Sequence, residues 1–233
     1  MTDRIRKLGI LMVVIGVVFA LAGVFAFTQV QAGYGSLQAF SEAQGVELSY
    51  NADGQLIDRG TTEGADAIMS LLEDDWGYPV NYSDLDPSDP LVNTATEYMF
   101  QMATVGFHVL NGTQTVVLTE ATEYNGETFA AGSYDVAVDG RYWAGFDRTS
   151  PIDGPARSQA WSGTVHGLFG ELGVGTVTAS TLQLGLGVSA LTFGLGLTIM
   201  LLGAGMYWVG KGKEEDTYHV LVDSSPMPEP AEV

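Results

Sequence analysis

Two long, uninterrupted apolar runs frame the chain. Residues 8–30 and 182–209 contain no Asp, Glu, Lys or Arg. At a rise of about 1.5 Å per residue, a helix of either length can cross a hydrocarbon core of about 30 Å. The pattern therefore predicts two transmembrane helices, at 8–30 and 181–209, which flank the segment 31–180.

A cleavable signal peptide is the alternative for the first run, because small residues lie between Thr28 and Gly33. The apolar core of a signal peptide is usually about 7–15 residues long, and this run is longer. Gln29-Val30-Gln31-Ala32 is also a poor cleavage site, because it lacks two small residues one position apart. These features favour a helix that stays in the mature protein.

The pattern changes several times between the two runs. Residues 46–58 alternate apolar and polar side chains around Asn51-Ala52-Asp53-Gly54, which predicts a β-hairpin. Apolar positions at helical spacing predict a helix over 62–76, capped by Thr61 or Thr62. A second helix is predicted over 89–111, with a proline in its first turn and an Asn-Gly stop signal at its end.

Residues 113–146 have a period of two, which predicts an antiparallel meander of about four strands. Asn125-Gly126 and Asp139-Gly140 supply turns in this meander. Residues 159–172 return to helical spacing and are expected to lead into the second span near the membrane surface. The expected fold class is therefore α+β, a mixed helix and antiparallel β-hairpin domain between two transmembrane helices.

The charges divide sharply along the chain. Three of the nine cations precede the first run, and Lys211 and Lys213 follow the second. The segment 31–180 has 21 acidic and four basic residues, a balance of −17. By the positive-inside rule, residues 1–7 and 210–233 are expected in the cytoplasm and the middle segment outside the plasma membrane.

Composition removes several classes of function. The formal charge of −19 disfavours a nucleic-acid partner, because phosphate binding needs clustered cations. The chain has no cysteine, which excludes disulfides, thiolate zinc sites and iron–sulfur clusters. The acidity itself fits either a saline habitat or the concentration of cations near a membrane surface. Acidic residues and prolines predict a disordered tail over 210–233.

Glycines form a regular pattern in both apolar runs. They recur at intervals of seven residues at Gly9, Gly16 and Gly23, at Gly187 and Gly194, and at Gly196 and Gly203. Seven residues are close to two helical turns, so each set lies along one face of its helix. Small residues let helix backbones approach closely in lipid, which favours helix pairing within the chain, with another membrane protein or with a second copy. The alternative is that glycine is simply common in transmembrane helices.

Asp84, Asp86 and Asp89 form the best candidate cation site, because calcium prefers several carboxylate oxygens on a flexible loop. The alternative is that these side chains face water, with Asp89 capping a helix. Residues 51–54 match only the middle of a calcium loop and are better read as a turn. His108 and His166 would bind zinc only by converging with a carboxylate, and structural roles are favoured for both.

Catalytic motifs are missing from the sequence. It has no G-x-S-x-G elbow, no H-E-x-x-H and no phosphate loop. The favoured function is therefore a non-enzymatic accessory or scaffold component of a cell-envelope complex, without a cofactor. An extracytoplasmic sensor or calcium-binding domain is the alternative.

The second run carries a resemblance to a known group of proteins. It reads Thr181-Leu182-Gln183-Leu184-Gly185-Leu186-Gly187-Val188, with Gly194-Leu195-Gly196 further on. Together with the glycine-spaced first run and the acidic middle segment, it resembles uncharacterised two-span membrane proteins of actinobacteria. The resemblance implies the same membrane architecture with an extracytoplasmic domain, and it implies no activity.

Overall fold

The computed structural model describes the backbone of residues 2–223 and the side chains of residues 3–211. The chain divides into two compact units. Met1–Gly33 and Leu182–Val233 form the first, called the helical unit below, and Tyr34–Thr181 form the second, called the α+β unit. The fold mixes helices with small antiparallel sheets and contains two long apolar helices, α1 and α5.

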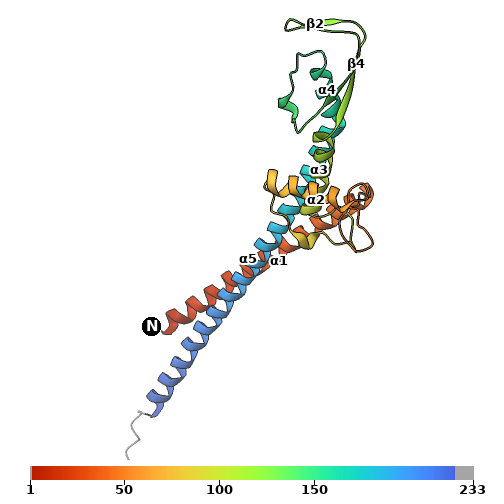
Figure 1. Cartoon of the computed structure of the whole chain (residues 1–233). Coiled ribbons are helices and arrows are strands. Elements are labelled where there is room, and N and C mark those ends of the chain that lie inside the picture. Colours follow the sequence, from red (N-terminus) through yellow and green to blue (C-terminus); the bar gives the residue numbers. More distant parts are fainter. Residues whose placement is uncertain (1, 224–233) are drawn as a thin grey trace, which may run out of the picture. The chain divides into compact units, whose positions relative to one another are not determined.

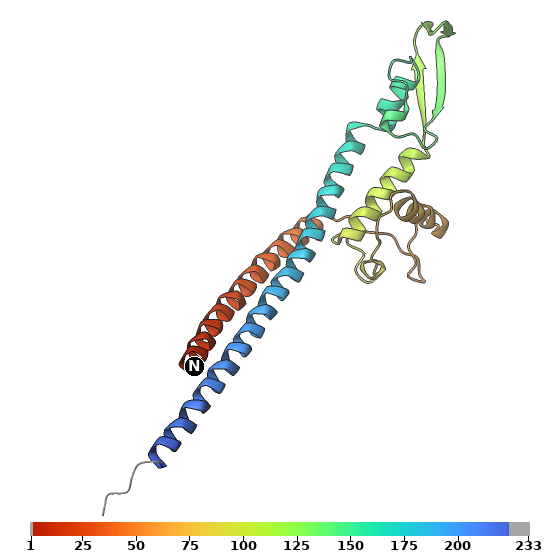
Figure 2. The same cartoon turned by 90° about the vertical axis from the view of Figure 1, so that its left-hand side faces the viewer.

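The helical unit consists of parts of α1 (Thr2–Gln44) and α5 (Gly163–Asp223). These parts lie side by side and antiparallel in both views (Figures 1 and 2). Each helix is uninterrupted and longer than the apolar run that predicts it. α1 ends where Gly45 adopts a φ of +60° and donates a hydrogen bond to the Ser41 carbonyl, because glycine tolerates this left-handed conformation best.

The tail expected to be disordered from residue 210 is helical up to Asp223. Residues 224–233 lie outside the described part of the chain. The sequence therefore underestimates the length of α5, because the charged and polar residues after 210 interrupt the apolar pattern without introducing a proline before Pro226.

The hairpin predicted over 46–58 is confirmed in its inner part, where the Asn51 and Ile57 amides donate to the Gln55 and Ser49 carbonyls, both at 2.9 Å. Tyr50 and Leu56 form one isolated bridge across the turn. Val46 and Leu48 instead exchange backbone hydrogen bonds with Pro90 and Val92, at 2.8 and 2.9 Å. The start of the alternating pattern therefore pairs with a segment about 45 residues away in the sequence, while its end pairs locally across the turn.

The predicted helix over 62–76 is present as α2 (Thr62–Ser70), which continues into a π-helical turn, η1 (Leu71–Asp75). The side chain of Thr61 caps α2 by accepting a hydrogen bond from the Gly64 amide. A short 3-10 turn, η2 (Tyr82–Asp84), follows.

The next helix, α3 (Ala95–Leu110), begins later than the prediction at Asp89-Pro90. Thr94 and Glu97 form a capping box, in which each side chain accepts a hydrogen bond from the other residue's backbone amide. This pair sets the start of α3, and Asn111 ends the helix where expected.

The meander prediction is partly wrong. β1 (Thr113–Leu118) pairs with β4 (Gly132–Ala137), and β2 (Thr122–Tyr124) pairs with β3 (Glu127–Phe129). The predicted turn at Asn125-Gly126 joins β2 to β3, with φ values of 49° and 80°. The two inner strands thus form a hairpin at the end of a two-stranded ribbon.

The chain does not return as a strand after β4. Arg141 begins a loop that holds a 3-10 turn, η3 (Trp143–Gly145), and the helix α4 (Asp153–Ala160) follows. The helix predicted over 159–172 is therefore split between the end of α4 and the start of α5.

Buried residues from helices, the ribbon end and the loop after it meet in one core of the α+β unit. The cluster comprises Leu71, Leu110, Val138, Phe146, Ala160 and Trp161. Trp161 is 5% exposed, and its indole nitrogen donates to the Arg141 carbonyl at 3.1 Å. The Trp161 ring is therefore buried with its single hydrogen-bond donor satisfied, and it supplies the central aromatic contact of the core.

Candidate functional site

The glycines of α1 and α5 meet in reciprocal pairs. A Cβ built on Gly9 would lie 2.6 Å from the Gly203 carbonyl oxygen, and one built on Gly203 would lie 2.7 Å from that of Gly9. Gly16 and Gly196 repeat the same relationship at 2.6 and 2.7 Å. No side chain larger than hydrogen fits at these positions without a shift of the backbone. We call this line of close approach the glycine seam.

The register of the seam explains the seven-residue spacing. From Gly9 to Gly16 the chain advances seven residues, while the partner on the antiparallel helix moves back seven, from Gly203 to Gly196. Such a repeat keeps the same faces in contact over successive pairs of turns. Gly23 continues the seam, where its missing Cβ leaves room for the backbone of Phe193 at 2.6 Å.

Close approach brings backbone groups into contact with each other. The hydrogen that occupies the Cβ direction of Gly16 points at the Gly196 carbonyl oxygen. Such Cα–H···O contacts contribute modestly, and they accompany tight backbone packing at helix interfaces. Close backbone packing of this kind is what holds helices together in lipid, where the hydrophobic effect between them is weak.

Ser189 belongs to the seam and was missed by the glycine pattern. It is 1% exposed, and its hydroxyl donates to the Leu186 carbonyl at 2.8 Å. It lies seven residues before Gly196. The period of seven would have identified Ser189 if all small residues had been considered, rather than glycine alone.

Gly187 and Gly194 lie outside the seam. A Cβ on either residue would meet nothing within 4 Å. The seven predicted packing glycines therefore separate into five that lie in the seam and two that face open space on α5.

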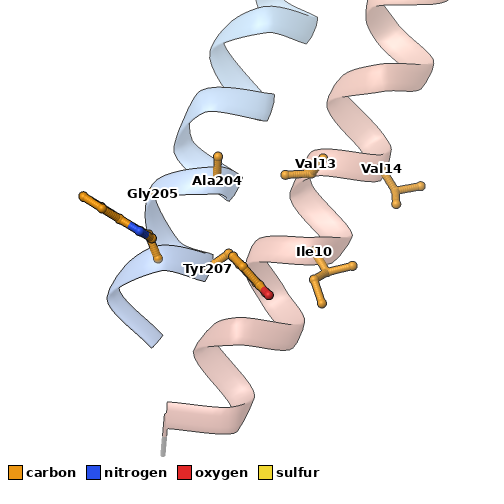
Figure 3. Close-up of a pocket in the computed structure, with 7 residues that line it drawn as sticks. Ile10, Val13, Val14, Ala204, Gly205 and Tyr207 are labelled. Atoms are coloured by element: carbon orange, nitrogen blue, oxygen red, sulfur yellow. The ribbon is translucent and has the colours of Figure 1, made fainter. Parts of the chain in front are cut away.

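An apolar groove lies beside the seam between α1 and α5 (Figure 3). It has a volume of about 620 Å³. Its lining residues are Ile10, Val13, Val14, Ala204, Gly205, Tyr207 and Trp208. The labelled side chains of Ile10 and Tyr207 project from opposite walls at one end of the groove (Figure 3). A second apolar hollow of about 280 Å³ lies near Gly23 and Phe193.

The two long helices leave most of their apolar surface uncovered. Both are long and apolar enough to cross a membrane, and only 11% of the most apolar stretch of each is buried within the chain. Leu191 is 73% exposed, Leu201 74% and Trp208 79%. Contiguous apolar exposure on this scale marks a surface that contacts lipid or protein.

Two of the three predicted cation ligands, Asp84 and Asp86, accept local hydrogen bonds through their carboxylates. The Asp84 carboxylate accepts from the Asn81 amide group at 2.7 Å. The Asp86 carboxylate accepts from both the backbone amide and the hydroxyl of Ser88, which lowers the pKa of Asp86. The Asp89 amide donates to the Asp86 carbonyl within the same turn. Calcium binding by Asp84, Asp86 and Asp89 stays a prediction.

The two histidines of the α+β unit have separate partners. His108 Nε2 lies 3.0 Å from an Asp58 carboxylate oxygen. His166 packs edge-on against the Trp143 ring, with 5.1 Å between ring centroids. Within residues 3–211, no three His, Cys, Asp or Glu side chains gather as they would around a metal ion.

Glu97 is the most buried carboxylate of the α+β unit, at 1% exposure. Its Oε2 atom accepts hydrogen bonds from the Asn93 and Thr94 amides at 3.0 and 2.8 Å. Burial raises the pKa of Glu97, and these hydrogen bonds oppose the rise. Burial, followed by the negative charges of Glu97 and Asp86, raises the pKa of Tyr50 to about 12. The Tyr50 hydroxyl is buried without a hydrogen-bond partner among the described residues.

A small apolar hollow of about 100 Å³ lies inside the α+β unit. Ser41 and Tyr98 line it and join through their hydroxyls at 2.8 Å. Its volume is well below the roughly 300–1,000 Å³ of typical small-molecule sites. Among the features described above, the seam with its adjoining groove is therefore the candidate site.

Comparison of the chain with models of protein families, with curated proteins and with solved structures gives no match.

Proposed function

We propose that this chain is a two-span protein of the plasma membrane that acts as a non-enzymatic accessory or scaffold component of a cell-envelope complex. The observation that best supports this proposal is the combination of a closely packed glycine seam with apolar helix surfaces that remain uncovered. In this proposal both termini lie in the cytoplasm and residues 31–180 lie outside.

The low burial of both apolar helices supports membrane insertion over a soluble role. A core helix of a soluble protein hides most of its apolar surface, whereas only 11% of the most apolar stretch of each helix here is buried within the chain. Uncovered apolar surface is unfavourable in water by roughly 25 cal/mol per Å². Lipid removes that penalty along both helices.

The seam also supports retention of α1 as a membrane helix. A cleaved signal peptide has no lasting partner, whereas α1 packs its backbone against α5 at Gly9 and Gly16. Removing α1 would expose the complementary glycines of α5, Gly196 and Gly203. The orientation in the proposal rests on the cations at the outer ends of the apolar runs and the acidity of the middle segment.

The scaffold role is inferred from which small residues of α5 are covered by α1 and which are left open. The seam occupies one face of α5, while Gly187 and Gly194 lie open on another. Small residues that no neighbour covers allow a further helix to approach closely in lipid. The helices thus serve as an anchor for the acidic α+β unit and as a contact surface for a second membrane protein or a second copy.

Topology is tested with single cysteines, because the chain contains none of its own. Thr128→Cys lies in β3 and Arg4→Cys near the start of α1, and both positions are exposed. A membrane-impermeant maleimide should label Thr128→Cys on intact cells and Arg4→Cys only after lysis. Recovery of the chain in the soluble fraction, or labelling of Arg4→Cys on intact cells, would overturn the proposed arrangement.

The partner is tested with a photo-crosslinking residue at Gly194, compared with the same residue at Leu195, which is 47% exposed and lies about 100° around α5 from Gly194. Purification in mild detergent should then yield one discrete crosslinked product from position 194, either with a second copy or with one other membrane protein. A monomer alone, without a crosslinked product from position 194, contradicts the scaffold role. That outcome leaves the topology test unaffected.

A further inference from the structure

One arginine of the α+β unit is half-buried and leaves its nitrogens unpaired. Nε and Nη1 of Arg157 are both enclosed, and neither makes a hydrogen bond with another described residue. By contrast, the Arg141 guanidinium donates to two backbone carbonyls and one carboxylate. Burying a donor without an acceptor destabilises a fold. The requirements of stability therefore do not explain the arginine at position 157.

The Arg157 guanidinium lies flat against an aromatic ring. Its central carbon is 3.6 Å from the centre of the Trp143 ring. Cation–π attraction of this kind fixes the plane of the guanidinium. The third nitrogen, Nη2, is neither enclosed nor bonded to a described residue. Arg157 thus presents a fixed positive charge with one nitrogen open at the surface, which suits it to an oxyanion.

Two exposed aromatic rings lie beside this charge, and both are held in place. Trp143 is 39% exposed and Tyr142 is 45% exposed. The Tyr142 ring stacks on Trp161, with 5.6 Å between centroids, and its hydroxyl accepts a hydrogen bond from the Trp76 indole nitrogen at 2.7 Å. Rigid aromatic rings offer a large contact area at a low cost in conformational entropy. These rings are therefore ready to pack against a flat ligand.

His166 adds polar groups at the same place. It is exposed and packs edge-on against Trp143, at 5.1 Å between centroids. Its ring nitrogens make no hydrogen bond with another described residue. A neutral imidazole offers one donor and one acceptor, which is the complement of a hydroxyl group. Tyr142, Trp143, Arg157 and His166 are called the Arg157 surface below.

The surroundings of Arg157 differ in charge from the rest of the α+β unit. Residues 141–157 contain three of the four arginines of segment 31–180 but only two of its 21 carboxylates. Both carboxylates are engaged, Asp153 with Arg141 and Asp147 with the Tyr124 hydroxyl. No described carboxylate comes within salt-bridge distance of Arg157 itself. A single anionic group can therefore approach Arg157, whereas a polyanion would meet the acidic remainder of the unit.

We propose that the Arg157 surface binds one acidic sugar unit of a cell-envelope polymer through its carboxylate. Nη2 of Arg157 donates to the carboxylate in a charge-assisted hydrogen bond. The apolar C–H face of the sugar ring packs on the exposed rings of Tyr142 and Trp143. His166 bonds a sugar hydroxyl, which orients the ring.

The openness of the surface favours a sugar over a peptide. None of its four residues lines any of the three apolar hollows described above. The side chains that dominate binding between proteins fill well-packed pockets. A flat ring needs only a flat aromatic surface with a few polar groups around it. The choice of a polymer outside the membrane rests on the proposed placement of residues 31–180.

The test uses the full-length protein in detergent, with its indole nitrogens labelled with nitrogen-15 for NMR. Methyl glucuronide and methyl glucoside are the probes, because they differ only by a carboxylate in place of a hydroxymethyl group. Methyl glucuronide should shift the Trp143 signal, which Trp143→Phe identifies, and should leave the Trp208 signal of the helical unit unchanged. Its Kd should be at least about tenfold lower than that of methyl glucoside.

Arg157→Met should abolish this preference for the acidic sugar without lowering the unfolding temperature. Methionine packs against Trp143 and buries no unpaired donor. A structural arginine would behave in the opposite way, with stability lost and the preference intact. Arg148→Met is the matched control at an exposed position of the same loop, and its preference should stay within about twofold of the wild type.

Equal affinities of the wild type for the two sugars, or an undiminished preference in Arg157→Met, would overturn the proposal. A third probe, N-acetylglutamate, carries a carboxylate without a sugar ring. If it shifted the Trp143 signal with the affinity of methyl glucuronide, the surface would suit a peptide carboxylate, and the assignment to a sugar would be wrong. An error in the proposed topology appears separately, in the cysteine labelling and not in these titrations.

Discussion

Gly16 and Gly196 face each other across two antiparallel helices so closely that each one's missing Cβ makes room for the other's carbonyl oxygen. Built Cβ atoms would lie 2.6 and 2.7 Å from those oxygens, closer than real Cβ contacts occur. A methyl group at either position must therefore push the helices apart. This contact makes the helical unit a closely packed pair rather than two independent anchors.

Gly16→Ala should destabilise the helix pair by about 1–3 kcal/mol, the usual cost of overpacking a tight interface. The spin-label distance between Arg4→Cys and Lys211→Cys measures opening of the pair during a titration with sodium dodecyl sulfate. Gly194→Ala is the matched control, because nothing lies within 4 Å of its Cβ position. Equal midpoints for the two alanine variants would show that the seam does not hold the helices together.

Glu97 should make the stability of the α+β unit depend on pH. Burial raises the folded-state pKa of Glu97 above its ordinary value of 4.5, so the folded state binds its proton more tightly. The stabilisation from the neutral form is complete below that ordinary value and is lost as pH rises through the raised folded pKa. Unfolding of the wild type, followed by tryptophan fluorescence, should show a decline in stability over this window.

Glu97→Gln should remove that part of the pH dependence. A glutamine carbonyl can still accept from the Asn93 and Thr94 amides, which both bond to one carboxylate oxygen in the wild type. Glu97→Leu, which lacks this acceptor, should instead lower stability by about 1–2 kcal/mol. Parallel pH profiles for the wild type and Glu97→Gln would contradict the prediction.

Arg141 connects the end of β4 to α4 through hydrogen bonds, and its replacement by lysine should lower stability. Its guanidinium donates to the Ala137 and Val138 carbonyls at 2.7 and 3.0 Å and to the Asp153 carboxylate at 2.8 Å. A lysine ammonium lacks the planar fork that makes these bonds together. Arg141→Lys should cost about 1–3 kcal/mol of unfolding free energy.

The control for Arg141→Lys is Arg148→Lys, at an exposed position in the same loop. Chemical denaturation of the full chain in detergent, monitored by tryptophan fluorescence, compares the two. Unfolding free energies that agree within about 0.5 kcal/mol would rule out the proposed role of the fork.

Tyr98 and Ser41 form a buried pair whose separation should be costly. Their hydroxyls lie 2.8 Å apart, and the two residues are 4% and 2% exposed. Tyr98→Phe leaves the Ser41 hydroxyl without this partner and should lower stability by about 1–2 kcal/mol. Thermal unfolding should show the loss, and Ser41→Ala should recover part of it in the double variant. Tyr82→Phe, at a position 60% exposed, is expected to be nearly neutral.

Local signals predicted several elements correctly. The apolar runs located the long helices, Thr61 marked the start of α2, and Asn111-Gly112 marked the end of α3. Asn125-Gly126 predicted the one tight turn that joins β2 and β3, because both residues tolerate a positive φ. Each of these signals lies within a short stretch of consecutive residues, so it can be recognised in the sequence alone.

Contacts between distant segments account for some of the errors. The alternation over 46–58 predicted a local hairpin, which forms over 49–57, but Val46 and Leu48 bond to Pro90 and Val92. The sequence predicts a start for α3 at Asp89-Pro90, whereas the Pro90 carbonyl accepts a hydrogen bond from the Leu48 amide and the Thr94–Glu97 capping box begins the helix. The distant pairing of Val46 and Leu48 is not visible in a local window, because its partner lies elsewhere in the chain, whereas the Thr94–Glu97 capping box is a local signal that the prediction overlooked.

The glycine seam shows the same difference between what a sequence pattern indicates and what tertiary packing decides. The sequence alone established that glycines recur every seven residues in both apolar runs and that each set shares a helix face. It did not distinguish Gly196 and Gly203 from Gly187 and Gly194, because both pairs have the same spacing. That choice depends on the rotation and register of α5 against α1, which buries Ser189, Gly196 and Gly203 together and leaves Gly187 and Gly194 open. Periodicity determines which residues share a face, and packing between helices determines which face is used.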